Sequence, residues 1–232
     1  MTHIKSRNGW FDIDLKEIVR YRDLIFLFVK RTYSTRYKQT ILGPLWLILN
    51  PLITVVLYCL VFGNIAKLST DGSPQFAFYL AGNSIWSYFA LCLNQTSTTF
   101  TDNSNIFGKV YFPRLTMPIA TVLTGMLDLL IQMAMLTLLL VYYAVTGNPV
   151  HVGAGLLLIP VIIIQCAMLG LGCGIIISSL TTKYRDLSIV VTFGVQLWMY
   201  ASPVVYSVTQ IAEGHRGLYM LNPMSPILTV WR

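Results

Sequence analysis

Charged residues are nearly absent from four long, apolar stretches of this chain. Residues 39–66, 72–101 and 187–212 contain no Asp, Glu, Lys or Arg, and residues 115–182 contain only Asp128. The core of a lipid bilayer holds no water to solvate a charge or a bare peptide group, so it is crossed by helices of about 20 apolar residues. The pattern therefore predicts an all-α integral membrane protein.

The uncharged stretches divide into five predicted spans. The stretch that starts at Leu115 is far too long for one crossing at about 1.5 Å per residue, and Gly147-Asn148-Pro149 is a turn signal near its middle. We therefore expect a polytopic helix bundle over residues 41–208, with spans at about 41–66, 76–98, 117–146, 152–180 and 188–208.

Basic residues predict the orientation of these spans. Of the 16 Lys and Arg residues, 13 precede the first span or follow spans two and four, and three lie on the other side. Loops rich in Lys and Arg stay in the cytoplasm, so residues 1–40 are expected to be cytoplasmic and residues 209–232 extracytoplasmic. The net charge of +7 then describes a membrane surface and not a nucleic-acid footprint. With the apolar run 227–231, either the chain ends outside or a sixth span is missing from this sequence, and we favour the second.

Composition agrees with a membrane protein that carries no chemistry of its own. Hydrophobic residues make up 55% of the chain and charged residues 11%, against about 25% charged in an average soluble domain. The sequence contains no phosphate-binding loop, metal-ligand cluster or nucleophile elbow. We therefore assign no catalytic residue, metal or cofactor to this chain. The four cysteines, all within apolar runs, are expected to be buried thiols.

A basic segment with interleaved tyrosines leads into the first span. Asp12 is expected to cap an amphipathic helix there, and such a segment lies in the headgroup plane with its cations toward lipid phosphates. It is either a membrane anchor or a gate that receives an anionic lipid headgroup. The candidate gate residues are Lys30, Arg31, Tyr33, Arg36, Tyr37 and Lys38.

Aromatic residues are concentrated in spans one, two and five, several of them near the middle of the membrane. Interfacial belts explain aromatic rings only at span ends. Sugar rings stack on aromatic faces, so these residues are either a path for a glycan or ordinary core packing. The candidate path residues are Trp46, Tyr58, Phe62, Trp86, Tyr88, Phe89, Trp198 and Tyr200.

Two short cytoplasmic loops, at residues 99–116 and 181–187, combine aromatic and charged side chains. Such loops are either plain tethers or docking sites for a cytoplasmic partner. Their candidate contact residues are Lys109, Tyr111, Arg114, Tyr184, Arg185 and Asp186.

Two features within the spans have structural interpretations. Small residues recur every four positions along span four, which lets two helix backbones approach closely: Cys166, Gly170, Gly174 and Ser178. Asp128 is the one acid within a span. Because no base lies in any span beside it, we expect a buried carboxyl with a structural role rather than a proton relay.

An ordered set of short motifs resembles the permease subunit of type 2 ABC exporters for bacterial surface polysaccharides, which include O-antigen, capsule and teichoic-acid transporters. The resemblance covers nearly the whole chain. It rests on Arg36-Tyr37-Lys38 with Gly43-Pro44-Leu45-Trp46, on Asn50-Pro51, Tyr111-Phe112-Pro113-Arg114 and Tyr184-Arg185-Asp186, and on Ser202-Pro203 and Asn222-Pro223-Met224.

The resemblance implies a homodimer of six-span subunits in the bacterial inner membrane. Each subunit would contact a separate ATPase, which binds ATP and Mg, through the two inner loops. The dimer would export a lipid-linked polysaccharide of O-antigen type, received at an interfacial and gate helix between residues 12 and 38. A membrane glycosyl- or phosphotransferase acting on the same lipid is the alternative. It would need two or more acids, or a basic cluster, at one membrane face to hold a metal or diphosphate, and the acids Asp102 and Asp186 lie in different loops.

Overall fold

The computed structural model describes residues 15–38, 41–146, 157–211, 217 and 219–232, and within these ranges every regular element is helical. The elements are α1 (Leu15–Arg20), α2 (Arg22–Tyr37), η1 (Gly43–Leu45), α3 (Trp46–Tyr58), η2 (Cys59–Ile65), α4 (Gln75–Asp102), α5 (Ser104–Phe107), α6 (Thr116–Val145), α7 (Ile159–Thr181), α8 (Leu187–Tyr200), η4 (Val208–Gln210) and α10 (Met224–Trp231). Asp12, predicted to cap the first helix, lies outside the described residues.

Within the described ranges, four helical segments are long and apolar enough to cross a membrane. They are Gly43–Ile65, which runs through η1, α3 and η2, together with α4, α6 and α7. The first segment begins at Gly43, whose φ of 48° is in the left-handed region that favours glycine. It continues through Pro51 and ends in the π-helical turns of η2.

The fifth predicted span is shorter than expected. Helix α8 has 14 residues, which reach only about 21 Å at 1.5 Å per residue. The prediction of one span over 188–208 is therefore wrong in extent. The helix ends at Tyr200 and turns follow, because Pro203 has no amide hydrogen with which to continue it.

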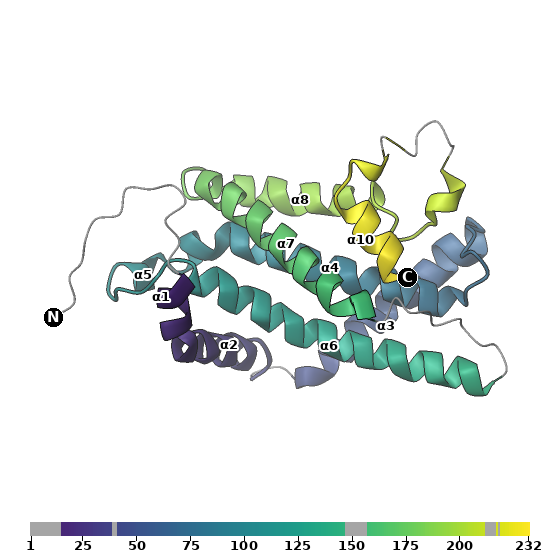
Figure 1. Ribbon diagram of the computed structural model, residues 1–232, viewed down its shortest axis with the longest axis horizontal. Helices are drawn as coiled ribbons and strands as arrows, with labels where there is room; N and C mark the ends of the chain where they lie inside the picture. The colour runs from purple at the N-terminus through teal and green to yellow at the C-terminus, as the bar shows by residue number, and fades with distance from the viewer. Residues whose placement is uncertain (1–14, 39–40, 147–156, 212–216, 218) are drawn as a thin grey trace.

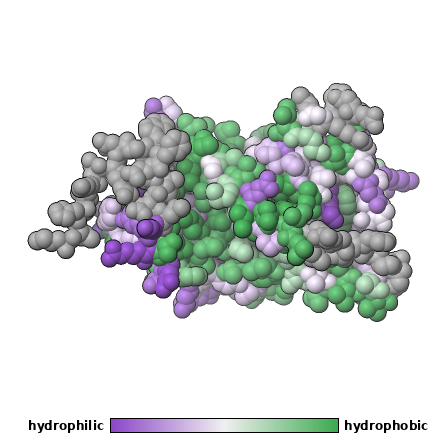
Figure 2. Space-filling view, viewed as in Figure 1, coloured by the Kyte–Doolittle hydropathy of each residue, from purple (hydrophilic) through white to green (hydrophobic). Residues whose placement is uncertain are grey.

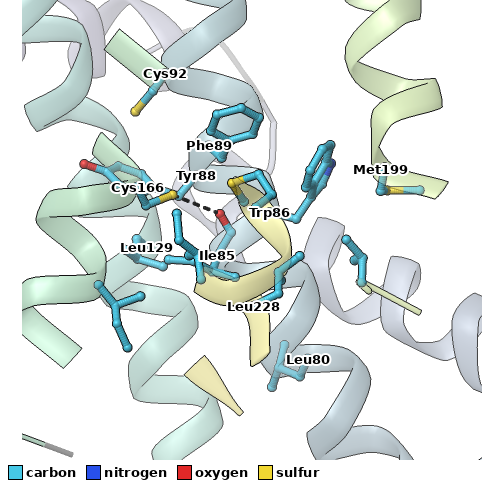
Figure 3. Close-up of a cluster of buried hydrophobic side chains, with 14 of the residues drawn as sticks. Leu80, Ile85, Trp86, Tyr88, Phe89, Cys92, Leu129, Cys166, Met199 and Leu228 are labelled. Atoms are coloured by element: carbon cyan, nitrogen blue, oxygen red, sulfur yellow. Dashed lines mark hydrogen bonds between the residues drawn. The ribbon is translucent and has the colours of Figure 1, made fainter. Parts of the chain in front are cut away.

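Helix α4 is the central helix of the bundle (Figure 1). It contacts α3, α6, α7, α8 and α10, and 78% of its apolar window is buried, against 11% for Gly43–Ile65. It contributes more side chains to the main hydrophobic cluster than any other helix, and its Ile85 and Phe89 are fully covered. Figure 3 shows these residues among side chains of α7, α8 and α10.

The stripe of small residues on α7 faces α4 of the same chain. A Cβ atom added at Gly170 would lie 2.8 Å from the Cβ of Cys92, and one at Gly174 would lie 2.5 Å from the Cβ of Thr96. No side chain fits at either contact. The predicted close approach of two helices is confirmed, and the partner helix, which the sequence could not identify, is α4.

Helices α1, α2 and α5 and the loop between α7 and α8 gather at one end of the bundle (Figure 1). We call this the basic end, because its described residues include Lys30, Arg31, Arg114 and Arg185. On the face in Figure 2, hydrophobic residues form a broad band across the middle, and hydrophilic residues gather where α1 and α2 lie. This is the distribution expected of a bundle whose middle lies in lipid.

Candidate functional site

An ion pair joins α2 to the middle of α6. The Arg36 guanidinium donates a hydrogen bond from Nη1 to Asp128 Oδ2 at 2.7 Å, and the two side chains are 29% and 13% exposed. Asp128 lies 12 residues into α6, about 18 Å along its axis. The buried, hydrogen-bonded carboxyl predicted from the sequence is observed. Its basic partner comes from outside the spans, because α2 folds back along α6 and places Arg36 beside Asp128.

A first cavity opens on the basic-end side of this ion pair. It has a volume of about 370 Å³ and lies between α2, α4 and α6. We call it the vestibule; its polar lining includes Arg31, Thr32, Thr35, Arg36, Gln95 and Thr99. Guanidinium groups bind phosphate oxygens through directed hydrogen bonds, and hydroxyl and amide groups add further donors. The vestibule is therefore suited chemically to an anionic headgroup.

A second cavity lies on the other side of the ion pair, nearer the middle of α4 and α6. This deep cavity has a volume of about 510 Å³, and Arg36 lines both it and the vestibule. Its polar lining comes from α2, α3, α4 and α6: Arg36, Asn50, Thr54, Asn83, Ser87, Asp128 and Gln132. The ion pair thus stands at the boundary between two polar spaces inside an apolar bundle.

Two buried oxygen atoms beside the deep cavity lack hydrogen bonds. No donor among the described residues reaches Asp128 Oδ1 or Gln132 Oε1. The two residues are four positions apart on α6, so their side chains lie on the same face of the helix. A buried polar atom without a partner costs free energy, so this face of α6 has unused capacity to accept hydrogen bonds.

Three other candidate gate residues, Lys30, Tyr33 and Lys38, line neither of the two described cavities. Lys30 and Lys38 are exposed, and Tyr33 is half-buried. Helix α2 ends at Tyr37, whose side chain lies outside what the structure describes. The helix is apolar on two sides: Ile25 and Phe28 are buried, yet Phe26 and Leu27 are 64% and 58% exposed. This two-sided pattern suits a helix that lies between the bundle and lipid.

The mid-depth aromatic residues are part of the hydrophobic core. Trp86, Tyr88 and Phe89 are 4%, 3% and 0% exposed (Figure 3). Trp198 meets the rings of Trp86 and Phe89 edge-on, with centroids 6.5 and 5.2 Å apart. Its Nε1 donates to Asn222 Oδ1 at 2.9 Å. The arrangement favours core packing over a sugar path for Trp86, Tyr88 and Phe89, because neighbouring side chains cover these rings, and Trp198 is half-buried against them.

The other candidate path residues divide into two kinds. Tyr58 makes edge contacts with Phe62 and Tyr79, at centroid distances of 5.8 and 6.2 Å, so Tyr58 and Phe62 also belong to packing. Trp46 and Tyr200 are 39% and 50% exposed. Of the eight residues, Trp46 is the one that lines a described cavity.

The two inner loops lie at the basic end (Figure 1). Lys109, Tyr111 and Arg114 are exposed in the loop between α4 and α6. Phe112 is 5% exposed, and its ring lies 5.7 Å from that of Phe28 on α2. The loop therefore presents charged side chains outward while one ring fixes it to the proposed gate helix.

The second loop presents its side chains in the same way. Tyr184, Arg185 and Asp186 are exposed between α7 and α8. Lys183 Nζ lies 5.3 Å from the centre of the Tyr184 ring, which holds a cation over an aromatic face. Both loops therefore have the exposure that a docking surface requires.

Comparison with known proteins identifies the family. The model of the ABC-2 type transporter family matches residues 23–232. The chain belongs to the ABC-2 type transporter family. It is 28% identical to an O-antigen export system permease protein RfbA of Klebsiella pneumoniae over 211 residues, which is 90% of this chain and 79% of the relative. It is 27% identical to a protein of the same name from Myxococcus xanthus over 220 residues, which is 94% of this chain and 82% of the relative.

Membership of the ABC-2 family confirms the resemblance read from the motifs and establishes a multi-pass membrane protein. An ABC-2 permease works with an ATP-binding ABC subunit. The deep cavity is the part of the site that the sequence did not reveal. Asn83 and Gln132 lie in ordinary apolar runs, and only the packing of α3, α4 and α6 brings them together. The available signal was the presence of amides at mid-span, where an unpaired amide is costly.

Proposed function

We propose that this ABC-2 permease is the transmembrane subunit of an ATP-driven exporter that moves a lipid-linked, O-antigen-like polysaccharide across the bacterial inner membrane. The observation that carries the proposal is the vestibule, a cationic and polar space beside the interfacial helix α2 at the basic end. The names of the Klebsiella and Myxococcus relatives support the same class of cargo.

The orientation of the bundle follows from the charge distribution. The basic end faces the cytoplasm, with residues 1–40 inside, because Lys and Arg are retained on the cytoplasmic side. A lipid carrier in the inner leaflet then meets α2 first. Its phosphate binds in the vestibule at Arg31 and the hydroxyls of Thr32 and Thr35, next to the guanidinium of Arg36, which is paired with Asp128.

ATP hydrolysis takes place in the partner. ATP and Mg bind the ATP-binding subunit, which docks on the two inner loops through Lys109, Tyr111 and Arg114 and through Tyr184, Arg185 and Asp186. Movement of the first loop reaches α2 through the buried contact of Phe112 with Phe28. Two copies of the chain form the transporter, so that the glycan leaves between or beside two such bundles.

A deletion strain tests the proposal. Membranes without this chain should accumulate lipid-linked glycan on their cytoplasmic side, and the cell surface should lose that glycan. Unchanged surface glycan would contradict an export role. Incubating the purified chain with a nucleotide sugar and a lipid phosphate tests the transferase alternative, and we expect no glycosyl transfer.

A further inference from the structure

The deep cavity has an imbalance of donors and acceptors that points to a ligand. Asp128 Oδ1 and Gln132 Oε1 are buried beside it without hydrogen bonds from the described residues. Gln132 is 7% exposed. Both unsatisfied atoms are acceptors, so a ligand that completes them must bring N–H or O–H donors.

The charges around the cavity argue against an ionic ligand. Asp128 is neutralised by Arg36 at 2.7 Å, so a cation would meet a guanidinium beside the carboxylate. An anion would face two unsatisfied oxygen atoms. The group that fits is therefore uncharged and carries hydrogen-bond donors, as the hydroxyl groups of a sugar do.

The walls supply the other contacts that a sugar ring uses. Trp46 lines the cavity and is 39% exposed, which leaves part of its ring free for stacking on sugar C–H groups. Asn50 is exposed at the same rim, whereas Asn83 is 6% exposed. The cavity thus has an aromatic and polar rim and a buried polar floor. Its volume of about 510 Å³ is typical of small-molecule sites and far exceeds the share of a single water molecule, about 30 Å³.

We infer that the deep cavity is a binding site within one subunit for a single uncharged sugar ring of the lipid-linked substrate, held by Asp128, Gln132 and Asn83 and stacked on Trp46. The inference rests on the proposed export function. Because Arg36 lines both cavities, a sugar in the deep cavity lies next to a phosphate in the vestibule. This order matches a substrate in which the first sugar is attached to the phosphate of its lipid.

Paired ligands measure the contribution of the sugar. The chain in nanodiscs free of sugar-headed detergent is titrated with a polyprenyl diphosphate and with the same lipid diphosphate bearing one neutral hexose. The hexose should tighten binding at least tenfold. Gln132→Met, which keeps the side-chain length and removes the acceptor, should reduce that increment about fivefold, the value of one neutral hydrogen bond.

Gln196→Met is the matched control, because Gln196 is an exposed amide on α8 outside the described cavities. Gln196→Met should keep the full gain in affinity that the hexose gives. The lipid diphosphate without hexose should bind the unchanged protein and both variants equally. No increment in the unchanged protein, or an equal increment in both variants, would overturn the sugar site.

Photo-crosslinking of the unchanged protein makes the test independent of how the variants fold. A diazirine on the hexose should label peptides of α3, α4 and α6 that contain Asn50, Asn83 and Gln132. Label confined to other helices would overturn the sugar site. If ATP-driven export persists in that case, the proposed export function still stands. Failure of both lipids to bind, together with loss of export, would overturn the proposed function as well.

Discussion

Helices α4 and α7 meet through Gly170 and Gly174, where an added methyl group would lie within 2.8 Å of the opposing side chains. Helices α2 and α6 meet through the pair of Arg36 and Asp128, flanked by two cavities of about 370 and 510 Å³. The first contact leaves no room for a ligand and fixes the scaffold. The second contains polar groups and space, which cost stability in an apolar bundle and so indicate a functional surface.

The largest expected effect on stability comes from truncating the packed region. Trp86→Ala removes a ring that is 4% exposed and should lower the free energy of unfolding by about 3–5 kcal/mol. Tyr200→Ala, at a ring that is 50% exposed, should be nearly silent. Thermal unfolding of the detergent-extracted proteins measures both. If the Trp86→Ala protein has normal stability but no longer exports, the result would support a glycan path along the aromatic rings instead of core packing.

Two glycines on α7 give a sharper test of the same region. Gly174→Ala places its Cβ 2.5 Å from that of Thr96 and should destabilise the protein by about 1–3 kcal/mol. Gly172→Ala meets nothing within 4 Å and should be neutral or slightly stabilising, since alanine favours a helix by about 1 kcal/mol over glycine. Equal stabilities of the two variants would show that the α4–α7 contact is looser than described.

The sequence predicted most reliably the features that local physics decides. The predicted starts of spans two and three, residues 76 and 117, fall one residue from the starts of α4 and α6, because gaps in charge mark membrane boundaries. The spacing of small residues on α7 likewise predicted a close helix contact. Both signals lie within one element and need no knowledge of its neighbours.

Long-range features were beyond the sequence. Arg36 and Asp128 are 92 residues apart, and their pairing depends on α2 folding back along α6. The mid-depth aromatics were assigned a possible path because composition shows which rings a helix carries, not which rings its neighbours cover. The end of α8 was missed because apolar residues continue past the turn at Ser202-Pro203.

The ion pair tests the second region. Arg36→Gln and Asp128→Asn should each destabilise the protein, because each leaves a partly buried charge without its partner. The double variant should lose less stability than the two single variants lose together, with a coupling free energy of about 0.5–3 kcal/mol. Lys30→Gln, at an exposed position of the same helix, is the control and should show no coupling with Asp128→Asn. Additive effects of Arg36 and Asp128 would mean that their contact does not hold α2 to α6.

The smallest effect on stability is expected at the inner loops. Arg114→Glu and Arg185→Glu alter exposed side chains and should change the free energy of unfolding by no more than about 0.5 kcal/mol. Both should nevertheless abolish ATP-driven export, because a reversed charge in the loop would repel an acidic docking groove on the ATP-binding subunit. Lys67→Glu, exposed near the opposite end, should export normally. Undiminished export by both loop variants would remove these residues from the docking surface.

Export per folded transporter, measured with thermal stability in the same vesicles, tests most directly whether the substrate uses the polar cavities or the aromatic core. The two variants to compare are Gln132→Met, in the deep cavity, and Trp86→Phe, in the core. We expect Gln132→Met to lower export severalfold at an unchanged melting temperature. Trp86→Phe should lower the melting temperature and leave export per folded molecule intact. The opposite result, with export lost in Trp86→Phe at full stability and retained in Gln132→Met, would contradict the account.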